Sequence, residues 1–410
     1  MEIFNKFYKR SIQERRQIII DTFNHADLFS SLHQDTYDNM IENAITTYEI
    51  PFGVAPGLII NNKSYVIPMA TEEPSVIAAQ ANAAKIIAMN GGLTAKVINK
   101  DMIGQLAFYN PKESFESILE NELEVLFKIA NDAKPSIVNR GGGLKKITWD
   151  TKHSDNNGSF FIIYASIDTQ EAMGANIVNT IMEALKNHLE PLFEQEATMA
   201  ILSNLADESL VEVECILDPS TLKNSETIAD KIQEASAFAQ VDPYRASTHN
   251  KGIMNGIDAL TLVSGNDTRA IEAGVHAYAA RSGYYKGLSQ WQSINGKLHG
   301  TMTLPVSVGT VGGTIKLNPK AQLAHEILGR PTKEELMIII AAVGLAQNFA
   351  ALYALTTDGI QKGHMALQAR ALILDCGATT SELDVLLPKV RNLKNPDKNT
   401  IMSLLDELRQ

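Results

Sequence analysis

The chain has 410 residues, which at roughly 150 residues per domain predicts two or three domains rather than one small module. Its 36 Lys and Arg residues against 47 Asp and Glu residues give a formal net charge of −11. That charge opposes attraction to a phosphate backbone, so nucleic acid is not expected as a partner. Apolar residues make up 45% and charged residues 20%, the balance of a folded globular protein rather than a disordered one.

The two cysteines, Cys215 and Cys376, are too few for a disulfide scaffold or a four-ligand zinc site, and no residue group has metal-ligand spacing. We therefore expect no metal. The N-terminus lacks the features of a signal peptide, which favours a reducing, cytoplasmic location. Residues 337–355 are apolar enough to imitate a membrane span, but Gln347 and Asn348 interrupt them. A buried core helix is expected there, and no membrane contact.

The first predicted elements are short helices over residues 7–50, followed by a β-hairpin. The hairpin is indicated by β-rich runs at 58–60 and 65–67 on either side of the turn-forming residues 61–63. The second strand leads into Glu72-Glu73-Pro74-Ser75 and then into an Ala-rich helix that stops at Gly91-Gly92.

Pro74 suits the first position of that helix, because a missing N–H costs nothing there. The two glycines at the other end can adopt the left-handed backbone conformation in which helices commonly end. Glu73 is therefore predicted at the rim of a strand-to-helix turn.

Near residue 100 the character of the sequence changes. A charged helix is predicted over 113–133, then two strands around a turn, the second over 160–167 and ending at Asp168. Apolar residues recur every four positions in the next helix. We interpret residues 101–207 as a separate α+β module inserted into the first domain.

The rest of the chain is predicted to alternate strands and helices. Residues 242–256 crowd polar, charged and glycine residues together, which suggests a functional loop or a plain solvated one. Residues 259–263 look like an apolar strand, with the carboxylate of Asp267 just beyond its end. Thr332 and Glu335 form a capping box that opens a long helix.

The predicted domain division follows from these elements. Residues 1–100 and 208–360 form a large domain, and residues 101–207 form a small one. Residues 361–410 form an amphipathic, charged helical appendage at the C-terminus.

A nucleotide site is suggested by the end of the second strand of the inserted module. No G-x-G-x-x-G occurs, but any helix N-terminus with small residues can receive a pyrophosphate. The candidate here is the helix start at Met173, Gly174, Ala175 and Asn176. A plain strand-to-helix turn is the alternative. Asp168 could bond the ribose 2′-OH of NADH, whereas it would repel the 2′-phosphate of NADPH unless its neighbours hold that phosphate away.

Taken together, these segments resemble 3-hydroxy-3-methylglutaryl-CoA (HMG-CoA) reductase in its bacterial class II form, over nearly the whole chain. The matching motifs, in the family's order and spacing, are Glu42-Asn43, Glu72 to Ser75, Asp168 to Asn176, Ile201 to Asn204, Asp242 to Asp258, Gly265 to Asp267, Val343 to Asn348 and Gly363 to Met365. The resemblance implies an α+β fold: a large mixed substrate-binding domain, an inserted ferredoxin-like nucleotide-binding domain and a C-terminal helical flap.

The resemblance also implies the site residues. The catalytic residues would be Glu73, Lys251, Asp267 and His364 on the flap. The residues that hold the hydroxymethylglutaryl end would be Ser75, Arg245 and Asn255, with Asn204 nearby. The cofactor would be bound at Asp168, Met173, Gly174, Ala175 and Asn176, with NADPH favoured and NADH possible.

The implied activity is reduction of HMG-CoA to mevalonate and free CoA by two hydride transfers, in the mevalonate route to isoprenoids, by a homodimer or larger homo-oligomer. The Lys251 ammonium suits stabilisation of the oxyanion that each transfer creates. Glu73 would deliver a proton and so must be protonated near neutral pH, and His364 would protonate the departing CoA thiolate. Two alternatives stay open: NAD-dependent oxidative degradation of mevalonate on the same fold, and a non-catalytic CoA-binding protein.

Overall fold

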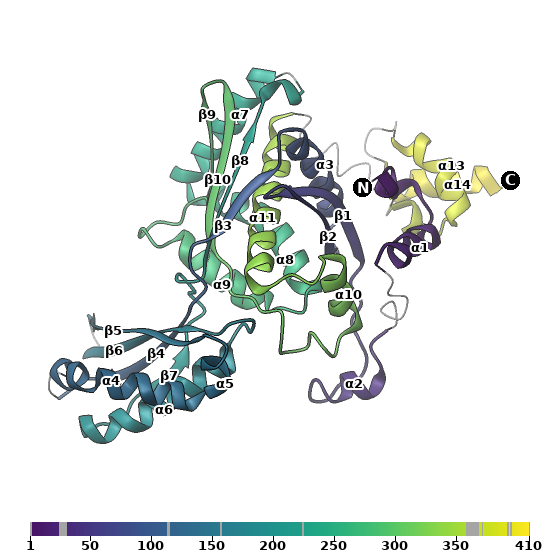
Figure 1. Ribbon diagram of the computed structural model, residues 1–410. Helices are drawn as coiled ribbons and strands as arrows, with labels where there is room; N and C mark the ends of the chain where they lie inside the picture. Colours follow the sequence, from purple (N-terminus) through teal and green to yellow (C-terminus); the bar gives the residue numbers. More distant parts are fainter. Residues whose placement is uncertain are drawn as a thin grey trace.

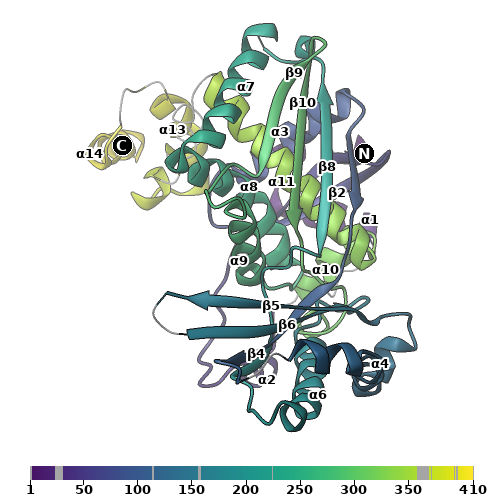
Figure 2. The same cartoon turned by 90° about the vertical axis from the view of Figure 1, so that its left-hand side faces the viewer.

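The computed structural model of the chain describes residues 2–23, 31–112, 115–155, 158–223, 225–357, 369–370, 372–391, 393 and 396–409. These residues form two β-sheets, each with its own hydrophobic core, and a separate group of C-terminal helices (Figures 1 and 2). The predicted α+β class is confirmed.

The larger sheet has six strands in the order β2-β1-β3-β8-β10-β9. The strands are β1 (Phe52–Ile60), β2 (Lys63–Ala70), β3 (Leu93–Val97), β8 (Leu210–Leu217), β9 (Ser289–Ile294) and β10 (Lys297–Pro305). All neighbours pair antiparallel except β1 and β3. The predicted hairpin is confirmed, since β1 and β2 are joined by Asn61 and Asn62 at φ 48° and 64°. Asparagine tolerates this left-handed conformation, which a two-residue hairpin turn requires.

Helices pack around this sheet. They are α3 (Val76–Met89), α7 (Ser225–Val241), α8 (Pro243–Val263), α9 (Thr268–Ala279), α10 (Pro319–Ile327) and α11 (Lys333–Thr356). Helix α11 lies at the centre, against α3, α7, α8 and strands of the sheet (Figure 1). Its most apolar window is 83% buried, and its capping box of Thr332 and Glu335 is present. The predicted core helix is thus found, and burial inside the fold explains its membrane-like hydropathy.

The smaller sheet belongs to the inserted module. Its elements are β4 (Met102–Tyr109), α4 (Glu116–Ala133), α5 (Pro135–Val138), β5 (Gly143–Ser154), β6 (Gly158–Asp168), α6 (Ala175–Phe193) and β7 (Met199–Leu202). The antiparallel strand order β5-β6-β4-β7, with α4 and α6 on one face (Figure 2), is the βαββαβ arrangement of a ferredoxin-like fold. This confirms that prediction. The module enters the chain between β3 and β8, which pair with each other in the larger sheet.

Three local predictions were wrong. Residues 242–256 are not a loop and 259–263 are not a strand, because Asp242 is the N-cap of α8 and the rest belong to that helix. The 3.6-residue period is hidden there because the buried side of α8 carries polar His249 and Asn250 as well as apolar residues. Pro74 is not at the first helical position either, since Ser75 is the N-cap of α3 and the helix begins at Val76.

The chain ends carry short helices. At the N-terminus these are η1 (Glu2–Phe4), η2 (Phe7–Lys9), α1 (Ile12–Phe23) and α2 (Gln34–Asp38), so short helices are present in the predicted region 7–50, although none lies in residues 39–50. A further short turn, η4 (Pro219–Thr221), precedes α7. At the C-terminus α13 (Thr380–Arg391) and α14 (Lys398–Arg409) share a small apolar cluster of their own, so the predicted helical appendage is present.

Candidate active site

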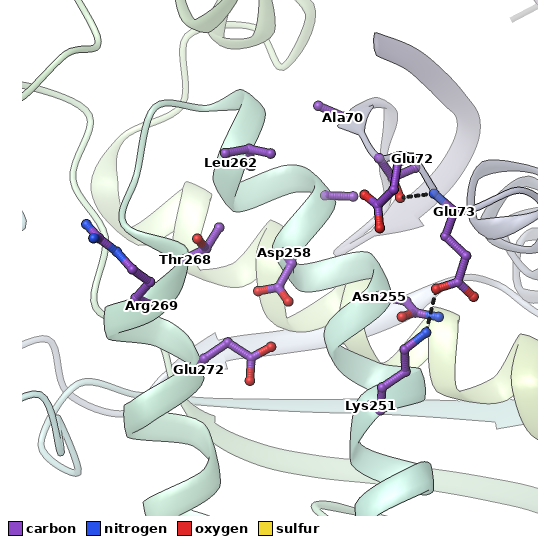
Figure 3. Close-up of a pocket in the computed structure, with 12 residues that line it drawn as sticks. Ala70, Glu72, Glu73, Lys251, Asn255, Asp258, Leu262, Thr268, Arg269 and Glu272 are labelled. Carbon is purple, nitrogen blue, oxygen red and sulfur yellow. Dashed lines mark hydrogen bonds and ion pairs between the residues drawn. The ribbon is translucent and has the colours of Figure 1, made fainter. Parts of the chain in front are cut away.

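A pocket of about 480 Å³ lies between the turn after β2 and the helices α8 and α9 (Figure 3). Its lining residues are Ala70, Thr71, Glu72, Glu73, Lys251, Asn255, Asp258, Ala259, Leu262, Thr268, Arg269 and Glu272. Three of the predicted site residues, Glu73, Lys251 and Asn255, are therefore brought together by segments far apart in the sequence.

Lys251 and Glu73 form an ion pair at the rim of this pocket. The Lys251 Nζ donates to Glu73 Oε2 at 2.5 Å, and the two side chains are 59% and 34% exposed (Figure 3). The backbone N–H of Glu73 donates to Thr71 Oγ1 at 3.2 Å, which fixes the turn after β2. Because an ion pair this exposed adds little to stability, its ammonium is available to a ligand at small cost.

Helix α8 presents three polar side chains to the pocket. Lys251, Asn255 and Asp258 are spaced by four and then three residues, so they share one face of the helix (Figure 3). On its other side, α8 packs closely on α11. A Cβ added to Gly256 would lie 3.0 Å from Gln347, so glycine permits this approach.

A buried polar network fixes α8 two residues before Lys251. His249 Nε2 lies 2.7 Å from Ser289 Oγ, which in turn donates to Asn348 Oδ1 at 2.8 Å. Trp291 Nε1 donates to the same amide oxygen at 2.8 Å. Burial, and to a smaller extent Arg245, lowers the pKa of His249 to about 4. The imidazole is therefore neutral and serves as part of the core.

Two carboxyl groups meet across the pocket wall. Asp258 on α8 faces Glu272 on α9, and both line the pocket (Figure 3). Burial, together with Glu272, raises the pKa of Asp258 to about 8. The pKa of Glu272 is lowered, chiefly by a hydrogen bond from His276, whose Nε2 lies 2.6 Å from Glu272 Oε2. Burial and a neighbouring carboxylate both disfavour the charged form of Asp258.

Asp267 follows a helix rather than the predicted strand, and it is the N-cap of α9. Its Oδ1 accepts hydrogen bonds from the backbone N–H groups of Arg269 at 3.0 Å and Ala270 at 3.2 Å. Burial acts to raise the pKa of Asp267, but hydrogen bonds from Arg269 and Ala270 outweigh it and hold the pKa below the usual value. Asp267 thus adjoins Thr268 and Arg269, which line the pocket, while its own carboxylate is paired with Arg269.

The remaining predicted residues lie around this centre. Ser75, two residues after Glu73, has φ 79°, a strained conformation for a residue with a Cβ and one that is common at functional sites. Arg245 lies in the first turn of α8 and is half buried. The carbonyl of Asn204 packs against Gly274 of α9, where an added Cβ would lie 2.6 Å from its oxygen. His364 lies outside the described residues.

The proposed cofactor segment opens α6. Gly174 is the N-cap at φ 107° and no side chain caps the helix, so the backbone N–H groups at this end are open to an anion. A Cβ at Gly174 would lie 2.3 Å from Thr169, so only glycine fits. Met173 precedes this residue and Ala175 and Asn176 follow it, so these residues fit a pyrophosphate-bearing nucleotide.

Asp168 points into its own turn. Its Oδ1 accepts from the Gln170 backbone N–H at 2.8 Å and its Oδ2 accepts from Gln170 Nε2 at 2.8 Å. The residue is only 6% exposed. The carboxylate is therefore already satisfied inside the protein.

A buried lysine attaches this segment to the large sheet's helices. Lys333, at the start of α11, is 1% exposed and donates from Nζ to Thr169 Oγ1 at 3.0 Å and to the Ala172 carbonyl at 3.2 Å. Its backbone N–H donates to Glu171 Oε2 at 2.8 Å. Thr310 also donates its N–H to the Glu171 carbonyl at 2.8 Å. The segment before α6 is thus held by Lys333 of α11 and by the backbone of Thr310, both outside the inserted module.

The sequence reasoning missed Asp258, Arg269 and Glu272. The signal was present in the spacing of Lys251 and Asp258, seven residues apart, but it is visible only once the segment is recognised as a helix. Within the described part of the chain, no group of three His, Cys, Asp or Glu side chains is arranged to hold a metal ion.

Comparison with known proteins identifies the family. The family model described as hydroxymethylglutaryl-coenzyme A reductase matches residues 11–369. The chain is 43% identical over 389 residues to the 3-hydroxy-3-methylglutaryl-coenzyme A reductase of Archaeoglobus fulgidus, covering 92% of this chain and 88% of that protein. It is 36% identical over 384 residues to the probable reductase of Borreliella burgdorferi, covering 91% and 87%.

Solved structures agree with this assignment. The 3-hydroxy-3-methylglutaryl-coenzyme A reductase of Streptococcus pneumoniae superposes with a TM-score of 0.84 at 42% identity, covering 99% of this chain and 100% of that one. A class II reductase structure from the same organism, bound to NADPH in open conformations, gives a TM-score of 0.82 at 43% identity, covering 98% and 100%. The chain therefore belongs to the hydroxymethylglutaryl-coenzyme A reductase family, in its class II form.

Proposed function

We propose that this protein is an oxidoreductase that converts HMG-CoA to mevalonate and free CoA, using NADPH. Membership of the reductase family and the NADPH-bound relative support this activity. The observation that carries the proposal is the ion pair of Lys251 with Glu73 at 2.5 Å in an open pocket, because it puts a movable ammonium beside a group able to accept and return protons.

Lys251 is the proposed oxyanion-stabilising residue. Each reduction of a carbonyl carbon places negative charge on the carbonyl oxygen, and a cation aimed at that oxygen lowers the barrier. Removal of one such donor typically costs about 3 to 4 kcal/mol. The anchored helix α8 supports this role, since the network around His249 holds the backbone that carries Lys251.

Glu73, Asp267 and His364 are the proposed proton-transfer and orienting groups. Glu73 would accept and deliver the protons of the reduced oxygen, and His364 would protonate the CoA thiolate as it leaves. Asp267 is paired with Arg269 in this structure. We propose that Asp267 turns toward Lys251 when substrate is bound, because an ammonium that stabilises an oxyanion needs a carboxylate to remain charged.

Asn255, Ser75, Arg245 and Asn204 are the proposed ligands of the hydroxymethylglutaryl group. Asn255 is supported most directly, because it lines the same pocket as Lys251. Arg245 offers a cation to the terminal carboxylate of the substrate, and the guanidinium fork matches a carboxylate in geometry.

The cofactor is proposed to bind at Asp168 and at residues 173–176. NADPH supplies the hydride for each of the two reductions. The uncapped N–H groups at the start of α6 would hold its pyrophosphate. Because both oxygens of Asp168 are bound by Gln170, the carboxylate is turned away from solvent, which favours tolerance of a 2′-phosphate.

We also propose a homodimer, in the cytoplasm, with a large domain of residues 1–100 and 208–360, a small domain of 101–207 and a C-terminal flap of 361–410. An apolar group at the turn between α7 and α8 supports an interface, since Val241 is 81% and Tyr244 86% exposed. Light scattering at assay concentration tests this, and an active monomer would contradict it.

The reaction is tested by its stoichiometry. Purified protein given HMG-CoA is expected to oxidise two NADPH for each CoA released, measured by NADPH absorbance and by thiol titration. Equal amounts of NADPH oxidised and CoA released would contradict the two-step reduction. Comparison of initial rates with NADH and with NADPH, in both directions, separates this function from oxidative mevalonate degradation.

A further inference from the structure

The pocket contains a second set of acid–base groups that the proposed roles do not use. Asp258 and Glu272 lie on facing helices and line the same pocket as Lys251 and Glu73 (Figure 3). Oδ1 of Asp258 is fully buried, and no N–H or O–H of the described residues donates to it. A buried carboxylate oxygen without a donor is costly, so this position favours a carboxyl group that carries a proton.

A hydrogen-bonded chain links this pair to solvent. Glu272 Oε2 lies 2.6 Å from His276 Nε2, and His276 Nδ1 lies 2.7 Å from the Tyr285 hydroxyl. The His276 side chain is 38% exposed, and the Glu272 side chain is 37% exposed. The imidazole therefore contacts the carboxyl pair on one side and is open to water, which is the arrangement needed to recharge the pair with protons.

The reaction proposed above consumes two protons, one for the new alcohol and one for CoA. In this structure Glu73 is the carboxylate partner of an ion pair with Lys251. A carboxylate in an ion pair has no proton to give, so Glu73 must be protonated from elsewhere before it can act. Among the residues that line the pocket, Asp258 and Glu272 are the two carboxyl groups that face each other from α8 and α9 (Figure 3).

We propose that Asp258 and Glu272 share one proton and form an internal reservoir that protonates Glu73 between the two hydride transfers. The inference rests on the proposed reduction. In this step an O–H bond of the pair breaks and an O–H bond forms on Glu73, without any change in oxidation state. The pair then takes a proton from His276, which regains one from water, so the chain returns to its starting state.

The geometry allows this transfer through solvent in the pocket. Asp258 lies seven residues after Lys251 on α8, which is about 10 Å along the helix. The pocket volume of about 480 Å³ is large compared with the roughly 30 Å³ that one water occupies in the liquid. A short chain of water molecules can therefore span the distance. Asp258 and Glu272 are positioning residues in this role, since they act on the substrate through Glu73.

Several other ionisable groups line the same pocket or contact the pair, and they enter its pH dependence. Glu72 and Glu73 come from the turn after β2, and Lys251 comes from α8. Arg269 and His276 lie on α9, with Tyr285 in contact with His276. No lining residue comes from α3, α7, α10 or α11. Outside the pair itself, the imidazole of His276 is the group in direct contact with it.

Two substitutions remove the shared proton and little else. Asp258→Asn and Glu272→Gln each keep the size of the side chain and one amide hydrogen bond across the pair. Each also leaves a single negative charge, as the protonated pair does. Glu214→Gln is the matched control, because Glu214 is an exposed carboxylate on β8, in the larger sheet.

The shared proton is measured by infrared spectroscopy of the apoprotein at neutral pH. Wild type and Glu214→Gln are expected to show the C=O stretch of a protonated carboxyl that shifts in D₂O, and both pair variants are expected to lack it. An unchanged band in Asp258→Asn and in Glu272→Gln would overturn the shared proton. If one variant does not fold, as judged by circular dichroism, the other provides the test.

The use of the proton is measured by the pH profile of NADPH oxidation. Both variants are expected to lose at least about tenfold in kcat, with the KM for HMG-CoA within about twofold of wild type. The alkaline limb of the kcat profile is expected to change in both variants and to stay unchanged in Glu214→Gln. Wild-type kcat and an unchanged profile in both variants would overturn the reservoir. A wild-type enzyme that shows the infrared band but does not oxidise NADPH with HMG-CoA would instead refute the proposed reduction, and with it the use of the proton.

Discussion

The buried ammonium of Lys333 gives the structure a pH-dependent stability that can be calculated. Lys333 is 1% exposed and bonds Thr169 and the Ala172 carbonyl, which attaches the cofactor segment to α11. Burial is the main cause that lowers the pKa of Lys333 from 10.5 to about 8. Nearby carboxylates act in the opposite direction but do not cancel it.

The sign follows from proton counting. Between pH 8 and pH 10.5 the unfolded chain keeps a proton on Lys333 that the folded chain has lost. The folded state therefore gains stability relative to the unfolded state as the pH rises through this window, and loses that stability as the pH falls from 10.5 to about 8. At 1.36 kcal/mol for each pKa unit, the full displacement is worth about 3 kcal/mol. Between about pH 7.5 and about pH 9.5 the gain is about 2 kcal/mol.

Lys333→Met keeps the length of the side chain and removes the titration. The free energy of unfolding of wild type minus that of Lys333→Met is expected to rise by about 2 kcal/mol between about pH 7.5 and about pH 9.5. Urea unfolding at equal protein concentrations, followed by the fluorescence of Trp149 in the small module and Trp291 in the large core, measures it.

Lys231→Met is the control, because Lys231 is exposed on α7. Its difference from wild type is expected to be independent of pH over the same range. A pH-independent difference for Lys333→Met as well would refute the reasoning, since it would mean that the ammonium titrates as it does in water.

Three further substitutions or reagents test other parts of the structure. Gly309→Ala is expected to raise the KM for NADPH in steady-state kinetics, with little change in the KM for HMG-CoA. The reason is that the new Cβ would lie 2.3 Å from the backbone of residues 171–173. Iodoacetamide at neutral pH is expected to modify Cys376 in the native protein and to modify Cys215 only after urea is added, because burial raises the pKa of Cys215 to about 12. Peptide mass spectrometry that finds both cysteines modified in the native protein would contradict this. Thr332→Ala is expected to lower the free energy of unfolding by about 1 kcal/mol by removing the N-cap of α11, and an unchanged urea midpoint would argue against a role for the capping box.

Local sequence signals were sufficient for much of the fold. The Asn61-Asn62 turn, the four-residue period of α6 and the capping box of α11 are properties of short segments, and each was found as predicted. Such signals are reliable because the residues that cause the structure are neighbours in the chain.

Helix α8 could not be predicted from local sequence signals. It carries polar groups on its buried side, where His249 and Asn250 are held by partners about 40 residues away. Gly256 also lies on that side, because close contact with α11 requires it. Tertiary contacts, rather than helix propensity or an apolar stripe, stabilise this helix, so its sequence resembled a functional loop.

The candidate site likewise contains residues that could be predicted from the sequence and residues that are found only from tertiary contacts. Family resemblance named Glu73, Lys251 and Asn255, which do line one pocket. It did not single out Asp258 and Glu272, because their closeness depends on how α8 and α9 face each other (Figure 3) and not on either residue alone. The pairing of Asp267 with Arg269 is likewise visible only in three dimensions.

The central claim is that the Lys251 ammonium stabilises the oxyanion formed when HMG-CoA is reduced. The most direct measurement is single-turnover NADPH oxidation by Lys251→Met with saturating HMG-CoA, alongside NADPH binding by fluorescence. We expect the rate of hydride transfer to fall by about 10²- to 10³-fold while NADPH binding stays unchanged. A rate within tenfold of wild type, with both ligands bound, would contradict the account.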